Sequence, residues 1–275
     1  MKQRILTGLV LAPIAVAAVL LSSAWFFASL LAVVWLLTMW EWTRLIGIQN
    51  VMVRVVYVVI GGLLMASLWS LQDSWIWWLS IGLGLLWWVL SLLWMRHFSF
   101  AASPTPRSVL IKVVAGILVL VPAWVAAVEL HGQSELGPAW TLFALAIVWA
   151  ADSFAYFVGS RYGRTKLAPR ISPGKTREGV WGALVGTGIV AMVGGWWLGE
   201  RGLPLILLVA LALVCVVLSV IGDLFESLMK RQANVKDSGA LFPGHGGLLD
   251  RLDGVFAAMP MFVAGKTLID LLLPT

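Results

Sequence analysis

The sequence consists of long apolar runs that recur from one end of the chain to the other. We count about nine of them, covering approximately residues 5–21, 24–40, 54–71, 75–95, 109–130, 138–159, 179–199, 203–221 and 254–273. Each is close to the roughly 20 residues that a helix needs to cross a hydrocarbon core about 30 Å thick. Because backbone groups find no water there, such segments cross as helices. The chain is therefore predicted to be an all-α, polytopic integral membrane protein.

The composition excludes a water-soluble protein. Hydrophobic residues make up 61% of the 275 residues and charged residues only 12%, whereas a soluble domain carries about 25% charged residues. No long domain outside the membrane fits between the runs. The single cysteine, Cys215, excludes an intrachain disulfide. The first run is longer than the roughly 7 to 15 apolar residues of a signal peptide, so we expect an uncleaved first helix.

The basic residues predict the orientation. With the N-terminus in the cytoplasm and the C-terminus outside, nearly all of the 19 Lys and Arg residues fall on the cytoplasmic side, Arg201 and Lys266 being the exceptions. This segregation is typical of membrane proteins. Tryptophans near the ends of the runs, among them Trp42, Trp77, Trp94 and Trp140, are expected at headgroup level.

The polar residues divide the chain into two regions. Residues 97–108, rich in Ser and Pro, separate about four N-terminal spans with few polar residues (1–108) from about five C-terminal spans (109–275). The second region contains two long loops, 160–178 and 222–253, that are predicted to face the cytoplasm. It is therefore the predicted catalytic region.

Carboxylates gather around the second of these loops. Residues 222–231 continue the preceding helix, which places Asp223, Ser227 and Lys230 on one face. Asp250 and Asp253 lie three residues apart where the last helix begins. Oxygen-rich sites of this kind suit Mg²⁺, and we predict Asp223 and Asp250 as its ligands. For Asp253 alone, a solvated loop residue or helix cap remains an equal alternative.

A glycine-rich stretch lies between these acids. In residues 242–247, the glycines allow the amides near His245, Gly246 and Gly247 to approach phosphate oxygens. Such a stretch alone is weak evidence. Its neighbours strengthen it, because they supply cations for a polyphosphate: Lys230, Arg231, Lys236 and Arg251. Together these residues indicate phosphoryl or nucleotidyl transfer.

The first loop, 160–178, offers further phosphate contacts. Its Gly-Lys-Thr at 174–176 is not a Walker A motif, because Pro169 stands where that motif needs glycine. Ser172 and Lys175, flanked by Pro and Gly, are candidates for phosphate binding. The loop's arginines equally fit a role in topology or in contacts with anionic headgroups.

One carboxylate lies within an apolar run. Asp152 is about 21 Å along its helix, a depth at which acids usually face a polar cavity. We expect it to line the substrate site, with a hydrogen bond to a neighbouring helix as the alternative. Lys266 and Asp270, four residues apart, are expected to pair with each other.

These motifs resemble a known family. Ser227-Leu-Met-Lys230-Arg231, followed by Lys236-Asp237-Ser-Gly239 and then by Leu241 to Asp253 (LFPGHGGLLDRLD), is similar to the signature of the phosphatidate cytidylyltransferases, or CDP-diglyceride synthases. The segments DSFAYF at 152–157 and ISP at 171–173 are similar to it as well. Gly174 and Arg177 depart from the family pattern.

The resemblance implies a reaction: CTP and phosphatidic acid give CDP-diacylglycerol and pyrophosphate in phospholipid biosynthesis. It implies Mg²⁺, allows a second cation, and points to a homodimer in the bacterial inner membrane with its active site facing the cytoplasm. The partners it implies are CTP, phosphatidic acid and membrane lipids, without nucleic acid. It places Asp237, Arg251, Asp253 and His245 among the catalytic residues.

Three other functions were considered. A CTP-dependent polyprenol kinase would share the fold and the metal but transfer the γ-phosphoryl group. A CDP-alcohol phosphotransferase needs an arginine that is missing after Asp253-Gly254. A transporter would place its ionisable residues near mid-membrane, whereas here they gather at one side.

Overall fold

The structure is an all-helical bundle with one small hairpin. The computed structural model describes residues 13–239 and 246–273. The elements are α2 (Ala24–Leu45), α3 (Val51–Trp69), α4 (Trp75–Arg96), α5 (Pro106–Gly132), α6 (Gly137–Tyr162), β1 (Lys166–Ala168), β2 (Ser172–Thr176), α7 (Arg177–Trp197), α8 (Gly202–Gln232) and α9 (Leu249–Leu272). These eight helices are long and apolar enough to span a membrane. The predicted fold class is thus confirmed.

The helix ends follow from local polar residues. Ser23, Asn50 and Thr105 precede α2, α3 and α5, and each side chain accepts a hydrogen bond from a backbone N–H of the first turn. Such caps satisfy donors that the helix itself leaves free. Of the first predicted run, 5–21, residues 13–21 are helical and the remainder lies outside the described residues.

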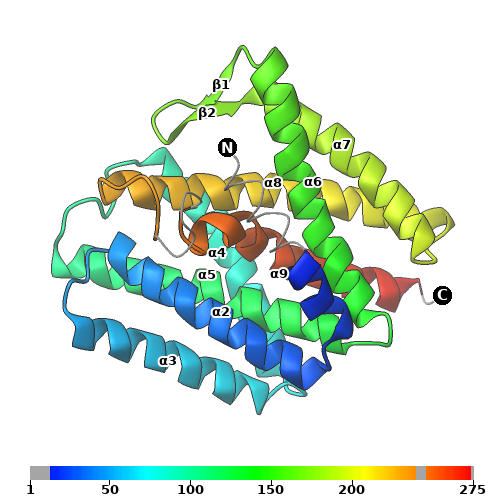
Figure 1. Ribbon diagram of the computed structural model, residues 1–275, viewed down its shortest axis with the longest axis horizontal. Coiled ribbons are helices and arrows are strands. Elements are labelled where there is room, and N and C mark those ends of the chain that lie inside the picture. The colour runs from blue at the N-terminus through cyan, green and yellow to red at the C-terminus, as the bar shows by residue number, and fades with distance from the viewer. Residues whose placement is uncertain (1–12, 240–245, 274–275) are drawn as a thin grey trace.

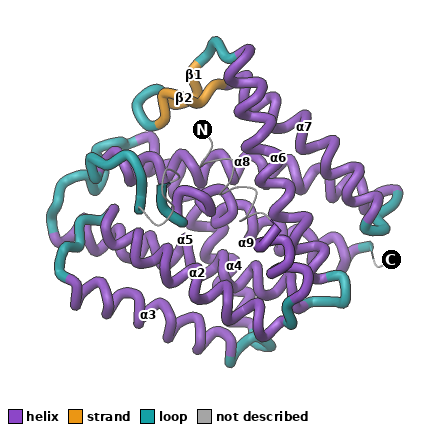
Figure 2. Tube along the Cα trace, viewed as in Figure 1, coloured by secondary structure: helices purple, strands orange, loops and turns teal. Residues whose placement is uncertain are grey.

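The helices fall into three groups. α2, α3, α4 and α5 pack together, α6 packs against α7, and α8 packs against α9 (Figure 1). The α8–α9 pair contacts both other groups. Figure 2 shows the hairpin at the apex of the α6–α7 pair. Helix α5 contacts helices from both predicted regions, the one before residue 108 and the one after it. The division at this residue stays a prediction.

Four of the tryptophans expected at headgroup level are buried against other helices: Trp42, Trp77, Trp94 and Trp140. Their depth in the membrane stays a prediction. Their rings find interior partners. Trp42 and Trp94 pack around Phe225 of α8, with ring centroids 6.2 and 5.6 Å away. Trp77 donates a hydrogen bond to Glu129 (2.7 Å). The aromatic packing around Phe225 holds α8 at the centre of the bundle.

The loop predicted at 160–178 contains an antiparallel hairpin. Lys166 pairs with Thr176, and Ala168 with Ser172. The carboxylate of Glu178 accepts hydrogen bonds from the backbone N–H groups of residues 164 and 165. The strands escaped prediction because they are short, and β2 contains Pro173 and Gly174. Because Lys175 lies in β2, the hairpin sets the position of its backbone.

The predicted orientation is testable by labelling. In sealed cells, Ser134→Cys is expected to react with an impermeant maleimide, because the loop between α5 and α6 should face outside. Ser103→Cys and Ser172→Cys are expected to resist it. Native Cys215 is buried, so the background should be low. Labelling of Ser172→Cys from outside would contradict the cytoplasmic placement of the hairpin.

Candidate active site

The site begins where α8 and α9 cross. Gly222 of α8 is buried, and a Cβ atom there would collide with the backbone carbonyl of Asp253 on α9. A Cβ on Gly254 would in turn collide with the side chain of Ser219 on α8. Small residues allow helix backbones to approach closely. The two glycines therefore bring the acidic ends of α8 and α9 together.

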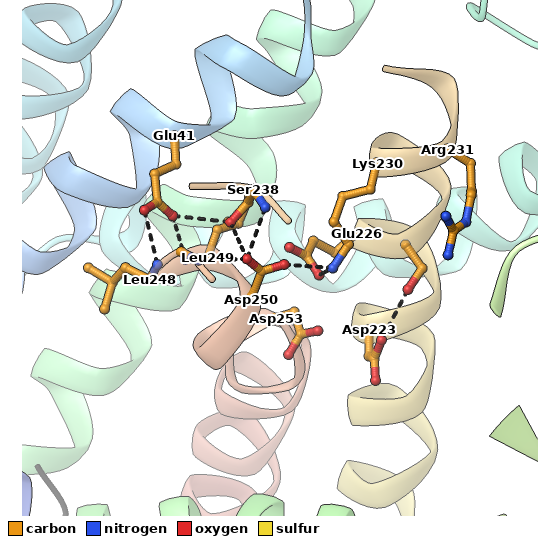
Figure 3. Close-up of polar contacts among 12 residues, drawn as sticks. Glu41, Asp223, Glu226, Lys230, Arg231, Ser238, Leu248, Leu249, Asp250 and Asp253 are labelled. Atoms are coloured by element: carbon orange, nitrogen blue, oxygen red, sulfur yellow. Dashed lines mark hydrogen bonds and ion pairs between the residues drawn. The ribbon is translucent and has the colours of Figure 1, made fainter. Parts of the chain in front are cut away.

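Three carboxylates meet at this crossing. One oxygen each from Asp223, Glu226 and Asp253 lies within 4.8 Å of the others, and Figure 3 shows them facing one another between the two helices. Glu226 is buried, and its Oε1 has no hydrogen-bond partner among the described residues. A buried carboxylate oxygen without a partner is costly. The donor set therefore fits a hard divalent cation.

Two lysines flank these carboxylates. Lys175 from the hairpin lies 2.5 Å from Oδ2 of Asp223. Lys230 donates hydrogen bonds of 2.7 Å to both Glu226 and Asp250. Both ammonium groups are partly shielded from solvent. The site thus combines a cluster of negative charge with cations suited to phosphate.

Asp250 holds the chain that leads into α9. Its Oδ2 accepts hydrogen bonds from the backbone N–H groups of Ser238 (2.9 Å) and Gly247 (2.7 Å), and from the Ser238 hydroxyl (2.8 Å). Gly246 has φ +81°, which favours glycine. A Cβ atom on Gly246 would also lie 2.7 Å from Asp250. Asp250 therefore orders the end of the glycine-rich stretch as well as pairing with Lys230.

Glu41 on α2 supports this arrangement from the N-terminal half. It is buried and accepts hydrogen bonds from the backbone N–H groups of Leu248 (3.0 Å) and Leu249 (2.8 Å). Its Oε2 also lies 3.2 Å from the Ser238 hydroxyl. These contacts satisfy free N–H groups where α9 begins. Glu41 thereby fixes the position of Asp250 and Asp253.

The structure brings together most of the residues predicted from the sequence. Ser227 donates a hydrogen bond to Asp223 (3.3 Å), as their shared face predicted. Asp152 on α6 is within range of the charges of Asp223 and Lys175. Its carboxylate is exposed and has no hydrogen bond in the described part of the chain. Its place in a substrate cavity stays a prediction.

Other predicted residues lie at the margin. Arg231 donates a hydrogen bond to the carbonyl of Ile171 (3.3 Å) and so joins α8 to the hairpin, where Ser172 is half-buried. The remaining charged residues of the signature are exposed: Lys236, Asp237 and Arg251. His245 lies outside the described residues. The roles predicted for all of these residues remain predictions.

Comparison with known proteins decides the family. The sequence pattern of the Cytidylyltransferase family matches residues 2–268. The chain belongs to this family. It is 40% identical over 270 residues to the phosphatidate cytidylyltransferase of Pseudomonas aeruginosa, and the aligned region covers 96% of each chain. It is 33% identical over 289 residues to that of Haemophilus influenzae, which covers 95% of this chain and 97% of the relative.

Two acids of this cytidylyltransferase-family site were absent from the residues predicted from the sequence. Glu226 carries a signal, because it lies three residues after Asp223 and four before Lys230 and so shares their side of the helix. Glu41 carries a weaker one, an acid where the positive-inside pattern leads us to expect cations. The contact of Glu41 with Leu249, far along the chain, was beyond sequence reasoning.

Asp152→Asn tests the cavity assignment. If Asp152 contributes to the field that holds a cation, the variant should have lower activity and require more Mg²⁺. If Asp152 were a helix–helix contact, Asn would replace it, with a stability loss of at most about 0.6 to 2 kcal/mol. A Mg²⁺ titration of activity and a melting curve in detergent separate the two. An unchanged Mg²⁺ midpoint with a lowered melting temperature would refute the cavity assignment.

Proposed function

We propose that this protein transfers a cytidylyl group from CTP to phosphatidic acid, forming CDP-diacylglycerol and pyrophosphate. The observation that carries the proposal is the cluster of Asp223, Glu226 and Asp253 beside Lys175 and Lys230. The relatives named phosphatidate cytidylyltransferase, similar along almost the whole chain, support the same reaction.

The reaction needs no covalent enzyme intermediate. One phosphate oxygen of phosphatidic acid attacks the α-phosphorus of CTP, a new P–O bond forms, and the bond to pyrophosphate breaks in line with it. Because the substrate brings its own anionic nucleophile, the protein's task is to align two anions that repel each other. Lys175 and Lys230 are placed to neutralise phosphate oxygens, and the amides near Gly246 and Gly247 to approach them.

Mg²⁺ is the proposed cofactor, and a second cation is allowed. When bound, the ion would polarise phosphate oxygens and offset the charge that develops on pyrophosphate. The geometry supports Asp223, Glu226 and Asp253 as the ligands. Asp250, predicted from the sequence as a ligand, is engaged with Lys230 and two backbone amides, so we propose that it positions the site and reaches the ion only by rearrangement.

The setting of the reaction is part of the same proposal. The helices support a multi-pass membrane protein, and the basic loops support an active site that faces the cytoplasm. We propose the bacterial inner membrane as its location and a homodimer as its assembly. Phosphatidic acid would reach the site from the membrane and CTP from the water phase.

Product analysis tests the proposal against the kinase alternative. Purified protein is incubated with phosphatidic acid and CTP labelled either at the α- or at the γ-phosphorus. We expect the α-label in a liponucleotide and the γ-label in pyrophosphate. In a parallel incubation, a polyprenol replaces phosphatidic acid. A polyprenol product that carries the γ-label would establish the kinase and overturn the proposal.

A further inference from the structure

A separate cavity of about 650 Å³ lies on the N-terminal side of the bundle. It is open on one side and is lined by the end of α2, the start of α3 and α5, the end of α8 and the loops beside them, and its size is typical of ligand sites. Three of its lining residues are basic, namely Arg44, Arg54 and Lys112, and none of the described lining residues is acidic. The cavity is therefore positively charged.

Lys112 is the most informative of these residues. It is only 5% exposed, and its ammonium group has no ion pair or hydrogen bond within residues 13–239 and 246–273. Its backbone carbonyl accepts a hydrogen bond from the indole of Trp42 (2.9 Å), which fixes the start of α5. Burying an unpaired charge is costly unless a counter-ion joins it. Lys112 lines the cavity, where a bound anion would supply the missing partner.

The side chain of Arg54 is fixed by several contacts on another wall of the cavity. Its Nε donates to the hydroxyl of Thr43 (2.7 Å), one Nη donates to the carbonyl of Trp40 (3.0 Å), and the guanidinium lies 3.9 Å above the Trp40 ring. Arg44 is close enough for its positive charge to repel that of Arg54. A role in membrane topology requires only cations at the correct side. It explains neither the burial of Lys112 nor this bracing of Arg54.

The remaining walls indicate an amphiphilic ligand. Leu45, Ile46 and Val109 line the cavity beside the cations. At the adjoining start of α3, Val51 and Met52 are 62% and 69% exposed, as side chains that face lipid would be. We propose that this cavity binds the phosphate headgroup of an anionic phospholipid, at a site separate from the carboxylate cluster.

Binding of phosphatidylglycerol tests the site. The full-length protein in neutral detergent is titrated with dioleoylphosphatidylglycerol, and bound lipid is counted by native mass spectrometry. Lys112→Met keeps an unbranched side chain, one atom shorter, and removes the charge, so its Kd should rise about tenfold. Arg107→Met is the matched control, since it removes an exposed charge from the first turn of the same helix outside the cavity. Its Kd should not change.

Further arms make each outcome decisive. Arg44→Gln, at an exposed position of the cavity, should raise the Kd about fivefold, and it supplies the test if Lys112→Met does not insert. Equal loss of binding in Lys112→Met and in the control Arg107→Met would overturn the proposal. Unchanged binding in both cavity variants, Lys112→Met and Arg44→Gln, would overturn it as well. Inorganic phosphate that binds as tightly as the lipid would overturn the lipid assignment. Lost turnover with phosphatidic acid in Lys112→Met would overturn the separation from the active site.

Discussion

Asp250→Asn is expected to lower turnover at least about 100-fold, which corresponds to about 2.7 kcal/mol of activation free energy. Asparagine keeps the volume but removes the charge that pairs with Lys230. It also presents one acceptor oxygen where the carboxylate uses two, for Lys230 and for the amides of Ser238 and Gly247. Cytidylyl transfer from labelled CTP, measured at equal amounts of inserted protein, gives the ratio.

Asp270→Asn is the matched control. It removes one carboxylate from the same helix, α9, near the end opposite to Asp250, where Asp270 pairs with Lys266. The variant should keep near-normal turnover. This ion pair was predicted from the spacing alone and is confirmed. Near-normal turnover of Asp250→Asn would show that neither the charge nor the ordering of Gly246 and Gly247 matters for the reaction.

Lys230→Met is expected to lower the free energy of unfolding by about 3–5 kcal/mol as well as to abolish turnover. Lys230 lies between Glu226 and Asp250, 2.7 Å from each. Without it, two carboxylates of low exposure are left without their cation, and removal of one partner from a buried pair costs about this much. Reversible unfolding in mixed detergent measures the loss.

The control for charge removal is Lys166→Met. Lys166 is exposed on β1 and lies outside the carboxylate cluster, so we expect a change within about 0.5 kcal/mol. Unchanged stability of Lys230→Met would indicate that Glu226 and Asp250 are hydrated or already paired with another cation in the working protein.

The membrane-spanning helices were predictable from the sequence because the bilayer imposes a single physical demand. A run of about 20 apolar residues identifies a span with little knowledge of its neighbours. The continuation of α8 to Gln232 was predictable for another local reason, the helical spacing of Asp223, Ser227 and Lys230. Both predictions use only the residue types within one segment.

Features that depend on packing between segments were not predictable. Nothing within the run 75–95 distinguishes Trp94, which packs on Phe225, from a tryptophan whose ring faces lipid. The contact between Glu41 and Leu249 joins residues 208 positions apart. Each is set by how the helices lie against one another, which one sequence does not specify.

The choice of acids for the metal shows the same limit. The sequence favoured Asp223 with Asp250, because both lie in the signature among cations. The structure groups Asp223 with Glu226 and Asp253, because Gly222 and Gly254 let α8 and α9 approach at that level. Lys230 then reaches Asp250. The residue types were evident from the sequence, whereas their grouping depends on the rotation of one helix about the other.

The central claim is that the cytidylyl group passes directly from CTP to the phosphate of phosphatidic acid. A CTP analogue that carries one sulfur atom of known configuration on its α-phosphorus tests this most directly. A single in-line displacement predicts a liponucleotide with inverted configuration at that phosphorus. Retained configuration would reveal a covalent enzyme intermediate and contradict the account, as would a lipid product that lacks the α-phosphorus.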